Sequence, residues 1–347
     1  MYDWLRRIFS SPVAAPVAQP AGRVAVALAQ VPPARVDTLG LSWLKRSGVT
    51  ADFNHWIFES QAASELFVTP LEQRVLDALD VIVESRQSGV NLVRRMPGLI
   101  PQLLQSLRSD DFSGAELARK ISNDVVLVAE VVRLANSAFY STEQSIASIE
   151  HAVLVLGQNG LRQLISGVAF KPIIGANSGH FTRQIAPRLW QQAEQCALAN
   201  RLLSEGEGVD HFEAFLTGLI QNVGLLAALR VIEQVADGDA SLGSESFCNV
   251  LIQQSRKLSC SIAREWQFPP AIINAIEQQG GTHTLDTMSP LARILSNGDF
   301  LSKVHLLEAH QLLAADALDG LSAEGLRCLA TLHTAAPIAT SEQLVDL

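Results

Sequence analysis

Residues 218–224 read Gly-Leu-Ile-Gln-Asn-Val-Gly and lie inside a long apolar stretch. Helical spacing places Gln221 and Asn222 on two adjoining apolar stripes, Ala214, Gly218, Gln221, Leu225 and Phe215, Leu219, Asn222, Leu226. Both amides are therefore expected to face inward, beside small residues that leave room. Buried amides must be hydrogen-bonded, so the simpler expectation is that they bond within the core. The alternative is a retained polar pocket that binds a small ligand.

Helical signals continue on both sides of this stretch. Asp210-His-Phe-Glu213 has the form of a capping box and predicts a helix that runs through about Val235. Further helices are expected over about 245–266 and 271–279, with Pro187 and Pro290 in the first turns of two others and helical segments continuing to about residue 334. The sequence shows no alternating strand pattern and no repeat of 20–50 residues. The sequence therefore predicts an all-α, multi-helix fold.

The composition narrows the class of protein further. The chain has 347 residues, 48% of them hydrophobic, and a net charge of −9 with a pI near 5.4. That acidic balance argues against general nucleic-acid binding, which needs clustered Lys and Arg. The four cysteines form no Cys-x-x-Cys pair and lie in apolar helical contexts. Buried free thiols in a reducing cytoplasm are therefore expected.

Changes in composition along the chain suggest four segments. Residues 1–35 are rich in Pro, Ala and Val and are expected to be a mobile N-terminal segment and linker. Residues 36–95 form a predicted N-terminal helical extension, 96–285 the main domain and 286–347 a C-terminal helical cap. No apolar run approaches the roughly 18 residues of a transmembrane segment. Pro12, Pro16 and Pro20 interrupt any signal-peptide core, so a cytoplasmic location is expected.

Seven short elements between Met96 and about Gly280 carry a family resemblance. In order they are Pro97-x-x-x-Pro101, Arg133-Leu-Ala-Asn-Ser-Ala-Phe-Tyr140, Ile146-x-Ser148-Ile149, Ala152-x-x-x-Leu156-Gly157, Trp190, Gly218–Gly224 and Trp266-Gln-Phe-Pro269. Together they resemble the HDOD family, the output-domain relatives of HD phosphohydrolases in bacterial signal transduction. The resemblance implies an HD-like topology. Structural roles are expected for the family-signature positions Asn136, Ser137, Gly157, Gly218, Gly224 and Trp266, with Asn136 and Ser137 capping a helix end.

The same resemblance identifies where the metal ligands of a hydrolase would lie. The His-Asp pair falls on Gln221 and Asn222, and an upstream His falls on Gln192. Further histidines fall near Ser255 and near Gln278 and Gln279. All six side chains are neutral here, and amides or hydroxyls bring no charge to hold a divalent ion. The sequence therefore predicts no metal site, no cofactor and no catalytic residue at these positions, which remain candidates for a vestigial pocket.

The rest of the sequence gives little support for a metal site or a catalytic site at other positions. His305, Glu308 and His310 are close in sequence, but histidines five residues apart point to different helix faces, so solvated surface residues are expected. The sequence has no Gly-x-Ser-x-Gly elbow and no phosphate-binding Gly loop.

Three functional hypotheses follow. The first is a non-catalytic bacterial signalling module that acts by protein–protein contact with a partner that the sequence does not name. The second is a sensor that binds a nucleotide or another small ligand in the vestigial pocket. The third, and weakest, is a metal-dependent phosphohydrolase with an unorthodox site.

Overall fold

The computed structural model describes residues 37–59, 67–84, 179–236, 242–280 and 285–334, together with single positions between 132 and 166. These residues form helices and contain no β-strand, so the predicted all-α class is confirmed. The linker over 1–35, most of the helices expected over 96–160, and Ser137 lie outside the described residues. The described elements are α1 (Trp43–Phe58), α2 (Pro70–Glu84), α7 (His180–Leu203), α8 (His211–Ile220), α9 (Val223–Val235), α10 (Glu245–Glu265), α11 (Pro270–Gln278), a 3-10 helix (Leu285–Thr287), α12 (Pro290–Ala309) and α13 (Ala323–Thr334).

Side-chain caps define where several of these helices begin. The Asp210 carboxylate accepts a hydrogen bond from the Glu213 amide at 2.7 Å, as the capping-box pattern predicted. The side chains of Ser244 and Ser289 cap α10 and α12 in the same way. Each cap satisfies an amide that the helix itself leaves without a partner.

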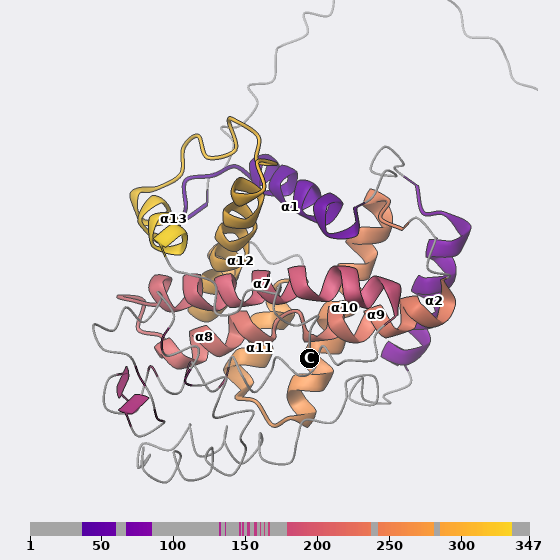
Figure 1. The fold of residues 1–347 in the computed structure, drawn as a ribbon, viewed down its shortest axis with the longest axis horizontal. Coiled ribbons are helices and arrows are strands. Elements are labelled where there is room, and N and C mark those ends of the chain that lie inside the picture. The colour runs from indigo at the N-terminus through magenta and orange to yellow at the C-terminus, as the bar shows by residue number, and fades with distance from the viewer. Residues whose placement is uncertain are drawn as a thin grey trace, which may run out of the picture. The chain divides into compact units, whose positions relative to one another are not determined.

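A long central helix, α7, organises the packing. It contacts α8 and α9 as well as α1, α12 and α13. In Figure 1, α1, α12 and α13 lie above α7, while α8 and α11 lie below it. Buried apolar side chains of α1 and α2, such as Phe53 and Leu79, belong to the same hydrophobic core as those of α7 and α12. The N-terminal extension and the C-terminal helices therefore pack on the domain between them.

Two glycines of the 218–224 stretch permit unusually close helix packing. A Cβ added at Gly218 would lie 2.6 Å from the backbone nitrogen of Ala197 on α7. At Gly224 it would lie 2.5 Å from the backbone nitrogen of Ser259 on α10. No real Cβ tolerates such contacts, so these positions hold α8 against α7 and α9 against α10.

Two helix boundaries differ from the prediction. The helix expected from Asp210 to Val235 is two helices, because the chain breaks at Gln221-Asn222 between α8 and α9. Pro187 lies inside α7, which begins seven residues earlier at His180. The combined span His211–Val235 is apolar enough to cross a membrane, but 83% of its most apolar window is buried, as in the core of a helical domain. The break at residues 221–222 places two side-chain amides between the ends of two helices.

The four cysteines are free and buried, as expected. Burial raises the pKa of Cys248 and Cys328 to about 12 and that of Cys260 to about 11. These thiols stay protonated at neutral pH and are unreactive.

Asn136 fixes the local backbone. Its side-chain nitrogen donates to the carbonyls of Val132 at 2.9 Å and Ile146 at 2.7 Å, and its oxygen accepts from the Ile146 amide at 2.7 Å. These bonds tie Asn136 to the backbone four and ten residues away. Gly157 has a φ of +63°, a conformation that favours glycine.

Candidate functional site

Three of the six vestigial positions meet at the junction of α7, α8 and α9. The Asn222 side-chain nitrogen donates to Oε1 of Gln192, which lies on α7. The Gln221 side-chain nitrogen donates to the Cys196 sulfur at 3.0 Å, and the Gln221 carbonyl accepts from the Ser259 hydroxyl at 2.7 Å. Gln192 is fully buried, and Gln221 is nearly so. These amides thus bond within the core, as the simpler sequence interpretation expected of Gln221 and Asn222.

An aspartate that the sequence analysis missed lies at the centre of this cluster. Asp299, on α12, accepts hydrogen bonds at Oδ1 from Gln192 Nε2 at 2.9 Å and from Gln221 Nε2 at 3.2 Å. Its other carboxylate oxygen lies 2.6 Å from the ammonium of Lys303, one helical turn along α12. Both side chains are largely buried. The acid of the cluster is therefore neutralised by a lysine, and its remaining oxygen is held by amides.

We call Gln192, Gln221, Asn222, Asp299 and Lys303 the amide–lysine cluster. Ser302 completes it, because its hydroxyl accepts from Gln192 Nε2 at 2.9 Å and donates to the Asp299 carbonyl at 2.8 Å. The cluster contains one anionic group, one cationic group and a closed set of hydrogen bonds. Such an arrangement is stable without an added ion.

The other three vestigial positions lie apart from this hydrogen-bond network. Ser255 is 4% exposed and borders a cavity of about 40 Å³ beside the cluster, and its hydroxyl has no partner among the described residues. Gln279 borders the same cavity, but its amide nitrogen donates to the carbonyls of Ala275 and Ala292. Gln278 accepts from the Ser289 amide at 2.8 Å and so joins α11 to the start of α12. Gln278 is thus a structural contact in this fold.

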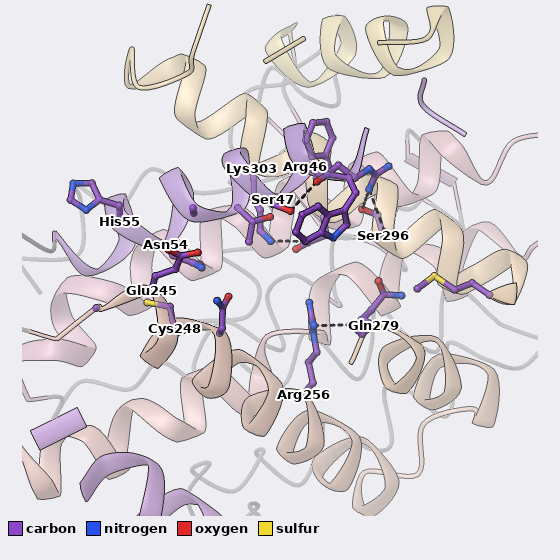
Figure 2. A pocket seen from close by; sticks show the side chains of 18 residues that line it. Arg46, Ser47, Asn54, His55, Glu245, Cys248, Arg256, Gln279, Ser296 and Lys303 are labelled. Atoms are coloured by element: carbon purple, nitrogen blue, oxygen red, sulfur yellow. Dashed lines mark hydrogen bonds and ion pairs between the residues drawn. The ribbon is translucent and has the colours of Figure 1, made fainter. Parts of the chain in front are cut away.

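A second, larger cavity of about 460 Å³ adjoins the first, and both are lined by Asn54, Arg256, Gln279, Asp299 and Lys303. Figure 2 shows its lining residues on α1, α10 and α12, together with Gln279, which follows the end of α11. One face of α1 lines it at helical spacing, through Trp43, Arg46, Ser47, Thr50, Ala51, Asn54 and His55. We call this space the α1 pocket. The N-terminal extension therefore forms one wall of a pocket at the vestigial site.

The polar lining of the α1 pocket contains both cations and carboxylates. Arg46 pairs with Asp37 and also donates to Asn297 Oδ1 at 2.5 Å. Arg256 donates to the Gln279 carbonyl at 2.7 Å. Burial lowers the pKa of Arg256, while the nearby Asp299 carboxylate raises it in part. Of the two arginines in the described lining, Arg256 is the one without a carboxylate at ion-pair distance.

Of the residues expected to be solvated near the end of α12, His305 is less exposed than predicted, whereas Glu308 and His310 are exposed. His305 is partly buried and stacks on His333 with ring centroids 5.0 Å apart, because α13 packs against this end of α12. Glu308 lies 3.1 Å from His333, and His310 stacks on Trp56. Solvation was therefore the wrong expectation for His305. Within the described ranges, no three His, Cys, Asp or Glu side chains are grouped so that they could hold a metal ion.

The comparisons with known proteins identify the family. The family model for the HDOD domain matches residues 93–281, more than half of the chain. The chain belongs to the HDOD domain family. The resemblance inferred from seven short sequence elements is thus confirmed.

Solved structures support the same fold for this HDOD protein. An HDOD domain protein of unknown function from Geobacter sulfurreducens is 18% identical, with a TM-score of 0.51, and the match covers 75% of this chain and 89% of that one. A candidate metal-dependent phosphohydrolase from Shewanella amazonensis SB2B is 16% identical, with a TM-score of 0.54, over 77% of this chain and 100% of that one. At these identities the likeness concerns the fold alone.

A curated relative is longer than this HDOD protein. An uncharacterized protein from Treponema pallidum is 19% identical over 242 residues, which is 67% of this chain and 46% of the relative. The chain thus spans less than half of that relative's length.

The HDOD match leaves out residues that complete the site. Asp299 and Lys303 follow the matched range, and Arg46 precedes it. These residues were not predicted, because they lie outside the family motif and belong to no common metal-ligand or nucleophile pattern. The signal available in the sequence was an Asp and a Lys four residues apart in one predicted helical segment, at positions 299 and 303.

Proposed function

We propose that this HDOD protein is a non-catalytic signalling module. The observation that carries the proposal is the ion pair between Lys303 and Asp299. A catalytic divalent ion needs anionic or imidazole ligands, but the vestigial positions supply amides and a hydroxyl. Lys303 already neutralises the one carboxylate that faces them. A metal ion at this point would have to displace an ammonium from a largely buried carboxylate.

Membership of the HDOD family supports a signalling role in the bacterial cytoplasm. We propose that the module passes on its signal by direct contact with a protein partner. Large apolar side chains are exposed on the helices that flank the domain, among them Trp43 and Leu44 on α1 and Leu326 on α13. Exposed apolar groups of this size favour protein contact when they are grouped, as Trp43 and Leu44 are.

Metal analysis of the purified full-length protein tests the non-catalytic proposal. We expect Mn, Fe and Mg well below one ion per chain, even after growth in supplemented medium. A restored variant, Q192H/Q221H/N222D/K303A, provides the positive control, because it returns imidazole and carboxylate ligands around Asp299. Stoichiometric metal in the unaltered protein that is lost in D299A would overturn the proposal.

Affinity capture from the native host, after crosslinking, tests the protein-contact proposal. We expect a defined partner that is recovered with the unaltered protein and lost with W43S/L44S. L326S is the control, because Leu326 is also an exposed large apolar residue but lies on a different helix. Equal recovery with all three proteins would contradict the assignment of the contact to α1.

The second candidate function, a small-ligand sensor, is favoured by one observation. The α1 pocket has the volume of a typical small-molecule site and adjoins the vestigial cluster. A ligand there would contact both the N-terminal extension and the helices that follow the break at residues 221–222.

A further inference from the structure

We propose that the α1 pocket binds an organic oxyanion of about mononucleotide size, with its phosphate or carboxylate group on Arg256 and its apolar body against Trp43. The inference rests on the proposed metal-free site, since Lys303 is taken to be engaged with Asp299. It assigns a ligand class to a pocket whose wall is the N-terminal extension.

Arg256 is the reason to expect an anion. Its side chain comes from the middle of α10 and points into the pocket in Figure 2. One guanidinium nitrogen donates to the Gln279 carbonyl, which leaves several of its five N–H donors for another acceptor. No carboxylate among the described residues lies within ion-pair distance of Arg256. A partly buried guanidinium without a carboxylate partner is costly, and an incoming oxyanion would offset that cost.

The other charged groups of the pocket are already balanced or distant. Arg46 pairs with Asp37, and Lys303 pairs with Asp299. Glu245 also lines the pocket, but it is exposed and lies eleven residues from Arg256 on the same helix. Eleven residues of α-helix span roughly 16 Å, too far for an ion pair. Among the arginines and lysines of the described lining, Arg256 is therefore the one with no carboxylate at ion-pair distance.

A neutral donor borders the small cavity next to the α1 pocket. Ser255 is 4% exposed and lines this small cavity, which shares Arg256 with the α1 pocket. Its hydroxyl has no partner within the described part of the chain. Native proteins rarely leave such a buried group unsatisfied. Ser255 itself does not line the α1 pocket, so the anion is assigned to Arg256 alone.

The lining of the pocket also includes apolar side chains. Trp43, Met288 and Phe300 contribute to the lining, and Trp43 is 77% exposed. Exposed Trp surface next to a cationic site offers a flat face for an aromatic or other planar group. A cavity of about 460 Å³ accommodates such a body together with its anionic group.

Calorimetric titration of the full-length protein tests the proposal with four probes: AMP, inorganic phosphate, succinate and adenosine. We expect AMP to bind more tightly than phosphate, because it adds the apolar contact, and adenosine to bind weakly because it lacks the anion. Phosphate binding without succinate binding would identify the group as a phosphate, and the reverse as a carboxylate. Absence of binding by all three anions at millimolar concentration would overturn the proposal.

Variants locate the anion. R256M should weaken AMP binding about ten- to hundredfold, the loss expected for a charge-assisted hydrogen bond. R264Q is the matched control, since Arg264 lies on the same helix in an exposed pair with Glu277, and it should bind as the unaltered protein does. W43A should weaken AMP but leave phosphate unchanged. Equal affinity in R256M and R264Q would overturn the assignment.

Two further measurements keep the test decisive. If R256M does not fold, R256K replaces it, because lysine preserves the charge but lacks the planar guanidinium. We expect R256K to lose less affinity for AMP than R256M would. Unchanged AMP affinity in R256K, with an unchanged dependence on salt, would count against the proposal. Metal content is measured on the same samples. Failure of anion binding in metal-free protein overturns only this inference, whereas stoichiometric metal overturns the proposed function.

Discussion

At the scale of single residues, the cluster around Asp299 shows how a hydrolase-like scaffold can be stable without its ion. The amide of Gln192 and the ammonium of Lys303 approach opposite oxygens of one carboxylate. Each donor is held in place by its own helix, α7 or α12. The Gln192 hydrogen bond therefore links α7 to α12 in addition to apolar packing, whereas the Lys303 ion pair lies within α12.

Removing the lysine should reveal its role. K303M leaves the Asp299 carboxylate largely buried without a cation. We expect a loss of about 1–3 kcal/mol in the free energy of unfolding, which is less than for a fully buried pair because both side chains are partly exposed to solvent. The double variant K303M/D299N should recover much of that loss, because the buried charge is gone. Urea denaturation measures both. A double variant no more stable than K303M would show that the ammonium does not act through Asp299.

Glu72 provides a pH-dependent contribution to stability. Its carboxylate accepts hydrogen bonds of 2.8 Å from the amides of Thr69, Gly243 and Ser244 and from the Ser244 hydroxyl. Burial raises the pKa of Glu72, but the combined hydrogen bonds outweigh it, so the pKa falls below its ordinary value of 4.5. The folded state then binds fewer protons than the unfolded state, and the contribution is lost as the pH falls below about 4.5.

The E72Q variant tests this linkage. We expect it to be less stable than the unaltered protein at pH 7 by about 1–3 kcal/mol, because an amide cannot accept all four bonds. The difference should narrow as the pH is lowered below about 4.5 and Glu72 itself protonates. Urea denaturation at pH 7 and at pH 4 gives both values. A gap that stays constant between them would exclude a contribution from the charge of Glu72.

At the scale of helices, the break at Gln221-Asn222 is the element that sequence reasoning described least well. The apolar stripes continue from α8 into α9 without interruption, so periodicity alone predicts one helix. We attribute the break to tertiary packing. Helix α9 packs on α10, and Gly224 allows that close contact. The caps at Asp210 and Ser244 and the first-turn proline Pro290 are local signals, and for this reason the corresponding helix starts were predictable.

The close contact at Gly224 can be tested directly. G224A places a methyl group against the backbone of Ser255 and Ser259, and we expect a loss of about 1–3 kcal/mol or more in the free energy of unfolding. G48A is the matched control, because Gly48 lies in the exposed interior of α1 with nothing within 4 Å of an added Cβ. G48A should stabilise by about 0.5–1 kcal/mol through helix propensity. Similar effects of the two changes would mean that Gly224 does not limit helix approach.

At the scale of the whole molecule, the site depends on segments on both sides of the family match. Trp43 and Arg46 precede residues 93–281, and Asp299 and Lys303 follow them. Family motifs predicted the positions of Gln192, Gln221 and Asn222. They gave no information about Asp299, since helical periodicity does not tell which distant helix packs over a given face. The pocket was unpredictable for the same reason, because α1 and α10 are separated by almost two hundred residues.

A consequence for fragments follows from the shared core. Leu41, Phe53 and Leu79 from the extension and Leu301 from α12 are buried in the same hydrophobic core as α7. We expect residues 35–334 to unfold in one cooperative transition, and residues 93–281 alone to lack it, because their apolar faces lose these partners. Circular dichroism during thermal unfolding compares the two fragments. Cooperative unfolding of 93–281 alone would show that the flanking helices are dispensable for folding.

The Lys303 ammonium differs from a metal ion in one respect that affects the living cell. A metal ion exchanges with its surroundings, whereas this cation is tethered to the backbone and is present whenever the chain is folded. The proposed module would then be insensitive to iron or manganese starvation, and a chelator such as EDTA should leave its melting temperature unchanged. A signalling protein built in this way would report on its partner or ligand independently of the supply of trace metals.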